Sequence, residues 1–150
     1  MSKTLRERAI GLLARREHSR AELARKLREH AGEGENLGAL LDDLERRKLL
    51  SDARYAEARA HTLAPRYGTA RILQELRMKG VADATQVVGV LQASELERAC
   101  AVWRKRFGTP PETPEERAKQ YRFLQSRGFS PEAIQRVIRL AEVGLAEAGN

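Results

Sequence analysis

Two stretches of the chain, Leu76-Arg-Met-Lys-Gly80-Val81 and Leu124-Gln-Ser-Arg-Gly128-Phe129, share a leucine, a basic residue before a glycine and an apolar residue after it. Their glycines are 48 residues apart, and Gly32 precedes Gly80 by the same interval. The residues before Gly32, Leu27-Arg-Glu-His-Ala, match the pattern with a shift of one residue. Such a glycine commonly closes a helix in the left-handed conformation. Equal spacing of this helix-ending signature predicts an internal repeat, with coincidence among glycine caps as the alternative.

Helical patterns extend outward from these glycines over nearly the whole chain. Leu5, Ala9 and Leu12 follow the i, i+4, i+7 spacing of a buried helix face, and comparable stripes recur to the end. Ser19 to Glu22 and Ser94 to Glu97 have the pattern of capping boxes, in which a hydroxyl and a glutamate bond to backbone N–H groups at a helix start. We therefore expect nine helices: first helices of three units near 4–16, 52–64 and 94–107, second helices near 20–31, 69–79 and 114–127, and third helices near 37–48, 83–92 and 131–146.

This repetition predicts the fold class, an all-α, elongated array of three tandem three-helix repeats. The joints are expected at Ser51-Asp52 and Gln92-Ala-Ser94, which places the repeats at 1–50, 51–93 and 94–150. Helical repeats longer than 40 residues form arrays because each repeat packs mainly on its neighbours. Four glycines are expected to close helices in the left-handed conformation: Gly32, Gly80, Gly108 and Gly128.

Composition indicates a folded, basic protein. Of the 150 residues, 33% are charged and 41% are hydrophobic, and the formal net charge is +7. An apolar fraction this high distinguishes the chain from a disordered basic tail. The single cysteine, Cys100, excludes an internal disulfide and a cysteine-based zinc site. No apolar run approaches the roughly 20 residues of a membrane span, and the amino terminus lacks a secretory signal, so we expect a cytoplasmic protein.

The sequence offers little for catalysis. It contains no phosphate-binding loop motif and no nucleophile-elbow motif. His18 and His30 are interpreted as exposed residues at helix ends, and Cys100, within an apolar stripe, as a small buried hydrophobe. We therefore expect no enzyme activity, no cofactor and no metal.

The excess of positive charge points instead to a binding function. A protein of net charge +7 is attracted over long range to a polyanion, whether bare nucleic acid or a nucleoprotein. In the second helix of the middle unit, Ile72, Leu73 and Leu76 are expected to face inward. Arg71 and Met78 are expected outside, near Tyr67, and this mixture of arginine, aromatic and methionine side chains suits a protein–protein surface. An ordinary solvated helix is the alternative.

Several stretches together resemble the RecX family of bacterial regulatory proteins, in order and over almost the full length. They are Arg15–Leu23, Leu40–Glu45, Leu50–Ala56, Arg66–Ile72, Glu75-Leu76 with Lys79–Val81, and Phe123-Leu124 through Arg127–Ser130. The chain departs from the family pattern at Thr69, where proline is usual, and in the register of Val87, Val88 and Leu91.

The resemblance implies a modulator of the RecA recombinase, and hence a role in homologous recombination, DNA repair and the SOS response. Members of the family are three tandem three-helix repeats that lie in the groove of the RecA–single-stranded DNA filament. There they inhibit strand exchange, ATP hydrolysis and co-protease activity. The expected contacts are outward residues of the middle unit and its flanks: Arg20, Arg28, Arg54, Arg66, Tyr67, Arg71, Arg77, Lys79, Arg122 and Arg127.

A second hypothesis is a helix-turn-helix-like protein that acts directly on DNA, since three-helix units can place a helix in the major groove. The outward residues lack a concentrated set of asparagine, glutamine and arginine suited to base edges, which speaks against it. Under the first hypothesis we expect a monomer whose partner is the RecA filament, with at most weak direct contact to DNA and no membrane partner.

Overall fold

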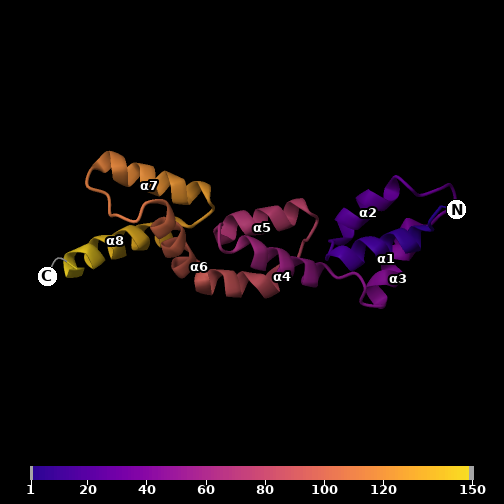
Figure 1. Ribbon diagram of the computed structural model, residues 1–150. Helices are drawn as coiled ribbons and strands as arrows, with labels where there is room; N and C mark the ends of the chain where they lie inside the picture. The colour runs from indigo at the N-terminus through magenta and orange to yellow at the C-terminus, as the bar shows by residue number, and fades with distance from the viewer. Residues whose placement is uncertain (1, 149–150) are drawn as a thin grey trace. The chain divides into compact units, whose positions relative to one another are not determined.

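The computed structural model describes residues 2–148, with side chains described through Gly144, and every regular element in this range is a helix. The all-α prediction is confirmed for this part of the chain. The helices are α1 (Leu5–Arg15), α2 (Arg20–Arg28), α3 (Leu37–Arg46), α4 (Asp52–Leu63), α5 (Thr69–Met78), α6 (Thr85–Arg106), α7 (Pro114–Ser126) and α8 (Pro131–Ala148), and they can be followed in Figure 1.

Local signals place most helix starts where the sequence predicts them. Thr4, Ser19, Asn36 and Thr113 are N-caps, and each side-chain oxygen accepts a hydrogen bond from the backbone N–H three residues later. Such bonds satisfy amide groups that have no partner within the helix. The serine and threonine signals of the sequence therefore mark the starts of α2 and α7 correctly.

Residues 2–148 contain eight helices rather than the expected nine, because α6 runs without interruption from Thr85 to Arg106. It covers most of both expected helices 83–92 and 94–107, so the helix break predicted at Gln92-Ala-Ser94 and the capping box at Ser94 are wrong, while the repeat boundary between 93 and 94 stays a prediction. The hydroxyl of Ser94 instead donates to the carbonyl oxygens of Val90 and Leu91 within the helix. No glycine or proline stands at Gln92, Ala93 or Ser94 to end the helix.

The left-handed conformation is confirmed at three of the four predicted glycines. Gly80, Gly108 and Gly128 have φ values of 86°, 74° and 92°. Gly32 is not among the positive-φ residues of the described chain, and Gly34, two residues later, has φ 83°. In the first repeat, the turn after the second helix therefore differs from the turns at Gly80 and Gly128, which agrees with the one-residue shift of its sequence pattern.

The helices form two compact units. The first contains the residues up to Arg59 together with Glu75–Ala84, and the second contains Ala60–Gln74 and the residues from Thr85 onward. This grouping rests on spatial proximity, and the boundaries of the three sequence repeats stay a prediction.

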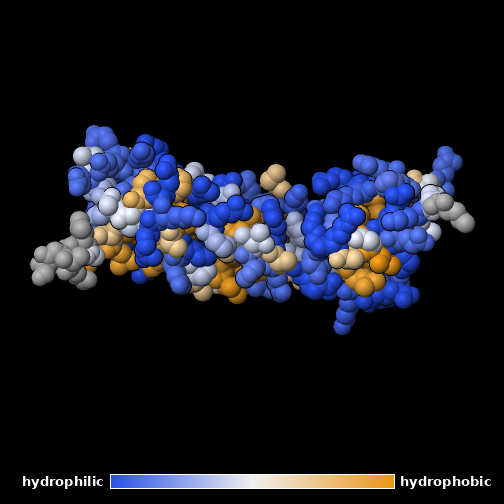
Figure 2. Space-filling view, viewed as in Figure 1, coloured by the Kyte–Doolittle hydropathy of each residue, from blue (hydrophilic) through white to orange (hydrophobic). Residues whose placement is uncertain are grey.

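Each unit has its own apolar core. In the first, leucines of α1, α2 and α3 pack together around Ala9, and Leu23, Leu27 and Leu44 are completely buried. In the second, α6, α7 and α8 bury Trp103, Leu124 and Ile134 with their neighbours. Figure 2 shows a mostly hydrophilic face on which apolar residues appear in separate small patches.

Candidate functional site

The second unit holds a cluster of arginines around Tyr67, which lies in the turn between α4 and α5. The guanidinium carbons of Arg71, Arg127 and Arg66 lie 4.2, 5.5 and 5.7 Å from the centre of its ring. Cations within about 6 Å of an aromatic face are attracted by the ring quadrupole. These contacts gather three positive charges at one half-buried tyrosine.

The cluster extends to a second aromatic ring, Phe123 of α7. The guanidinium carbons of Arg127 and Arg106 lie 5.0 and 5.3 Å from the centre of that ring, and Phe107 meets it edge to face at 5.5 Å. Arg127 therefore contacts both Tyr67 and Phe123. We call the set Arg66, Tyr67, Arg71, Arg106, Phe123 and Arg127 the arginine–aromatic cluster.

A cavity of about 420 Å³ opens beside this cluster. Its cationic lining comes from Arg66, Lys105, Arg106 and Arg127, and its apolar lining from Pro65, Ala101, Val102 and Phe123. No aspartate or glutamate is among these lining residues. A pocket with an apolar floor and a cationic rim suits a partner that combines an apolar side chain with negative charge.

The turn that carries Tyr67 is fixed by a close approach of two glycines. The N–H of Gly68 donates to the carbonyl of Arg127 over 2.7 Å, and a Cβ on Gly68 would lie 2.2 Å from the carbonyl oxygen of Gly128. Gly128, in the left-handed conformation, in turn leaves no room for a Cβ, which would lie 2.4 Å from the Cβ of Arg71. Glycine at both positions lets the α4–α5 turn and the α7–α8 turn meet backbone to backbone.

The first unit contains a similar approach at the equivalent glycine. A Cβ on Gly80 would lie 2.4 Å from the Cβ of Ala21 at the start of α2. There the hydroxyl of Ser19 donates to the carbonyl of Lys79 over 2.6 Å. The carbonyl of Lys79, before Gly80, thus accepts a hydrogen bond from Ser19 at the start of α2. The carbonyl of Arg127, before Gly128, accepts one from Gly68 at the start of α5.

Arg98 of α6 also stabilises the α4–α5 turn that carries Tyr67. Its guanidinium donates to the carbonyls of Ala64 and Tyr67 and to the hydroxyl of Thr69, and it also bonds to Ser94 and Leu91 of its own helix. Burial lowers its pKa, and nearby Glu95 partly offsets this. Arg98 is a positioning residue for the turn that carries Arg66 and Tyr67.

Four of the ten predicted contact residues come together in the cluster: Arg66, Tyr67, Arg71 and Arg127. Arg122 is exposed on α7 but is not among the residues that line the cavity. The expected burial is confirmed for Ile72 and Leu76, whereas Leu73 is only half-buried, and Met78 is 77% exposed.

The other five predicted residues belong to the first unit. Arg20 is paired with Asp42 and Glu45 at 2.7 and 2.6 Å, and Arg54 with Glu17 at 2.9 Å. Arg28 and Arg77 are exposed and Lys79 is half-buried. Since Arg20 and Arg54 already have carboxylate partners, they are less available to an outside anion.

Sequence reasoning missed Lys105, Arg106 and Phe123. The run Arg104-Lys105-Arg106 was interpretable only as cations at the end of a helix, where they complement the helix dipole. Phe123 stands four residues before Arg127, the residue that caps the C-terminal end of α7, and this i, i+4 spacing was the available signal.

The exposed position expected for His18 is wrong. His18 is 1% exposed; its Nδ1 lies 3.1 Å from the carbonyl oxygen of Arg16 and its Nε2 lies 3.0 Å from the Nζ of Lys26. Because an ammonium group can only donate, Nε2 accepts and Nδ1 carries the proton, which makes the ring neutral. Burial lowers the pKa of His18, and the charges of Arg16 and Lys26 lower it further.

Neither a metal centre nor a reactive thiol emerges from the described residues. They contain no group of three or more histidine, cysteine, aspartate or glutamate side chains placed to hold a metal ion. Cys100 packs against the core of the second unit, and burial raises the pKa of its thiol. None of the helices within residues 2–148 has both the length and the apolar character needed to cross a bilayer.

Comparisons with known proteins agree on one family. The second three-helix domain of RecX matches residues 51–86, and the third matches residues 93–138. The regulatory protein RecX of Leptothrix cholodnii is 52% identical over 93% of this chain and 90% of its own length, and that of Ralstonia nicotianae is 51% identical over 93% and 89%. The crystal structure of RecX from Lactobacillus salivarius matches with a TM-score of 0.80 over 93% of this chain and 95% of its own, and at 20% identity it bears on the fold alone.

Proposed function

This chain belongs to the RecX family, and from that premise we propose that it binds the groove of the RecA–single-stranded DNA filament and inhibits its recombinase, ATPase and co-protease activities. Like the relatives it matches, it is a regulatory protein and not an enzyme. We place its action in the cytoplasm, as a monomer, where the filament forms.

The observation that carries this proposal is the arginine–aromatic cluster and its cavity. Four cationic side chains surround an apolar floor without a carboxylate among the lining residues. Arginine and aromatic side chains are enriched where proteins bind proteins, and positive charge favours approach to a filament that contains DNA. The cluster can therefore contact both an apolar side chain and an acidic group of the recombinase.

The test is RecA ATP turnover on single-stranded DNA, measured with increasing amounts of the protein. The variant is the double change Arg66→Glu with Arg106→Glu, because both side chains are exposed and neither has an ion-pair partner among the described residues. We expect half-inhibition to require about ten-fold more of the variant, which corresponds to a loss of about 1.4 kcal/mol of binding.

The matched control is Lys119→Glu with Arg139→Glu, which reverses two exposed charges of the same unit outside the cavity. It should inhibit like the unchanged protein. Equal inhibition by all three proteins would exclude the cluster as the contact surface. Failure of the unchanged protein to inhibit would overturn the proposed function, and inhibition that only follows binding to naked DNA would favour the direct DNA-binding hypothesis.

A further inference from the structure

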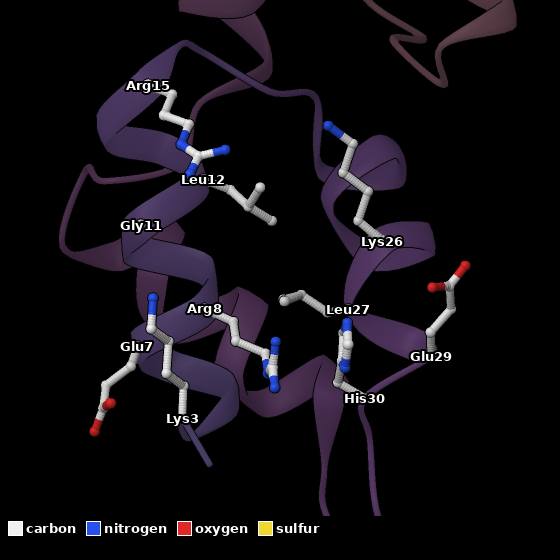
Figure 3. Close-up of a pocket in the computed structure, with 10 residues that line it drawn as sticks. All are labelled: Lys3, Glu7, Arg8, Gly11, Leu12, Arg15, Lys26, Leu27, Glu29 and His30. Carbon is white, nitrogen blue, oxygen red and sulfur yellow. The ribbon is translucent and has the colours of Figure 1, made fainter. Parts of the chain in front are cut away.

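A second basic cavity lies in the first unit, between α1 and α2 (Figure 3). Its volume is about 350 Å³. Five of its lining residues lie in α1 and one precedes that helix: Glu7, Arg8, Gly11, Leu12 and Arg15, with Lys3 before them. Two lie in α2 and two follow it: Lys26 and Leu27, then Glu29 and His30. We call this cavity the α1–α2 cleft. It belongs to a different unit from the arginine–aromatic cluster and needs its own explanation.

The charge inside the α1–α2 cleft is positive. Four lining residues are cations and two are carboxylates, and Figure 3 shows the carboxylates of Glu7 and Glu29 directed away from the space between the helices. Arg8 extends into that space from α1. Neither Arg8 nor Arg15 forms an ion pair with any described residue. Their charges are available to an anion from outside.

Gly11 gives a ligand room to approach the backbone of α1. It stands in the middle of the helix, and a Cβ built on it would meet no atom within 4 Å. Glycine in a helix interior costs roughly 1 kcal/mol relative to alanine, so local stability does not favour it here. Its position in the wall of a cationic cleft fits a site where another molecule comes close to the helix.

The lining indicates which anion fits. The cations are spread along the cleft from Lys3 to Lys26, and the apolar residues Leu12 and Leu27 lie between them. Among the lining residues only His30 carries a ring, so the cleft has no platform on which unpaired bases could stack. A row of charges without stacking side chains suits a polymer of phosphates whose bases are already paired.

We propose that the α1–α2 cleft binds the phosphodiester backbone of duplex DNA without reading its bases. Duplex DNA carries about one negative charge per 1.7 Å of its axis, and lysine and arginine side chains bind it by displacing counterions. This site goes beyond inhibition of the recombinase, because it requires neither RecA nor single-stranded DNA. It also differs from a helix-turn-helix site, because no helix enters the major groove.

The test measures binding of short fluorescent duplexes to the full chain by anisotropy, with single strands of the same length in parallel. The variant is Gly11→Glu, which adds a negative charge at a lining residue of the cleft whose position is free of contacts. Gly11→Ala is the control for the backbone. Gly89→Glu, at a helical glycine of α6 that is also free of contacts within 4 Å, is the control for net charge.

We expect Gly11→Glu to raise the Kd for duplex DNA about ten-fold and to leave the thermal unfolding curve close to that of Gly11→Ala. The two controls should bind within about two-fold of the unchanged protein. Replacing Arg15 with glutamine should lower the slope of log affinity against log salt by about 1, the value for one phosphate contact. Two duplexes of unrelated sequence should respond alike.

An unchanged Kd for Gly11→Glu, or an equal loss in Gly89→Glu, would overturn the α1–α2 cleft as the site. A loss confined to single strands would overturn duplex DNA as its ligand. RecA ATP turnover on single-stranded DNA contains no duplex substrate, so its outcome for the same variants separates failure of this site from failure of the proposed function.

Discussion

At the scale of single residues, His18 shows how a buried polar group is stabilised by its charge state. The neutral ring donates to the carbonyl of Arg16 and accepts from Lys26, and Glu22 is held nearby by Arg16 at 2.7 Å. The hydrogen bonds from Arg16 lower the pKa of Glu22 to about 2, so this carboxylate stays ionised above pH 4.5 and does not titrate between pH 5.5 and 7.5. His18 is therefore the group in this cluster that responds to mild acid.

We predict that the protein loses stability as the pH falls from 7.5 to 5.5. The folded state lowers the pKa of His18 below the ordinary value of about 6.5, so the unfolded chain binds the proton first and protonation favours unfolding. The stabilisation is complete above pH 6.5 and is lost below it, with a slope of at most about 1.4 kcal/mol per pH unit for one proton.

Urea unfolding at the two pH values measures this effect. The variant His18→Gln keeps one donor and one acceptor but cannot titrate, so its free energy of unfolding should change less between pH 7.5 and 5.5 than that of the unchanged protein. The same pH dependence in both proteins would show that another group is responsible.

His18 also shows where reading the sequence residue by residue fails. Its neighbours Glu17 and Ser19 are polar, and its place before a capping box suggested a solvent-exposed helix start. Ser19 is nevertheless buried, because its hydroxyl bonds to Lys79, which lies 60 positions away in the chain. Burial decided by such a distant contact leaves no local pattern.

At the scale of helices and turns, the 48-residue glycine spacing was the most informative part of the sequence. It correctly indicated that Gly80 and Gly128 end helices with a positive φ. It could not reveal that both glycines also receive a neighbouring segment at a distance that excludes a side chain. The second property depends on packing between turns, which the spacing of one sequence does not encode.

We predict that Gly128→Ala lowers the free energy of unfolding by at least about 2 kcal/mol. The substitution imposes a left-handed conformation on alanine and places its Cβ 2.4 Å from that of Arg71. Because the same contact sets the position of Arg71 beside Tyr67, inhibition of RecA should weaken at temperatures where the variant is still folded.

Denaturant unfolding and the ATP-turnover assay provide the two measurements. Gly89→Ala is the matched control, because Gly89 is helical and has open space around it. It should stabilise the protein by about 0.5–1 kcal/mol and leave inhibition unchanged. Equal stability of Gly128→Ala and Gly89→Ala would contradict the packing described at the glycine contact.

The error at Ser94 has a different origin. A capping box satisfies local rules, but the same four residues are compatible with a continuous helix when the hydroxyl bonds back to Val90 and Leu91. Ser94 also accepts a hydrogen bond from Arg98 at 2.9 Å. Hydrogen bonds within α6 therefore satisfy the serine hydroxyl that would otherwise cap a helix start.

At the scale of the whole molecule, the net charge of +7 predicts that association with the filament depends on salt. Inhibition of RecA should weaken as the concentration of a monovalent salt rises, because counterions screen attraction to a DNA-containing partner. The measurement is the concentration for half-inhibition over a salt series that leaves ATP turnover by RecA alone unchanged.

The double variant Arg66→Glu with Arg106→Glu should show a shallower salt dependence, while Lys119→Glu with Arg139→Glu should retain more of it. Inhibition that does not respond to salt would indicate that apolar contacts, rather than charge, control binding.

Four of the six residues of the arginine–aromatic cluster were among the predicted contacts: Arg66, Tyr67, Arg71 and Arg127. Arg66, Tyr67 and Arg71 are neighbours in sequence and share one turn, so they were predictable as a group. Arg106 and Phe123 come from α6 and α7, and only the packing of these helices in the second unit brings them to Arg127. Residues that meet through tertiary packing cannot be grouped from a single sequence.

Because α6 is a single continuous helix, it fixes the rotation about the helix axis between the buried residues near its start and those near its end. Its buried residues Val87 and Leu91 near one end and Ala99 and Trp103 near the other face directions about 120° apart around the axis. Inserting one residue near position 93 would turn everything beyond it by about 100° and advance it by about 1.5 Å. The length of this segment is therefore as constrained as its composition, whereas the loop between α6 and α7 can absorb an added residue without rotating either helix.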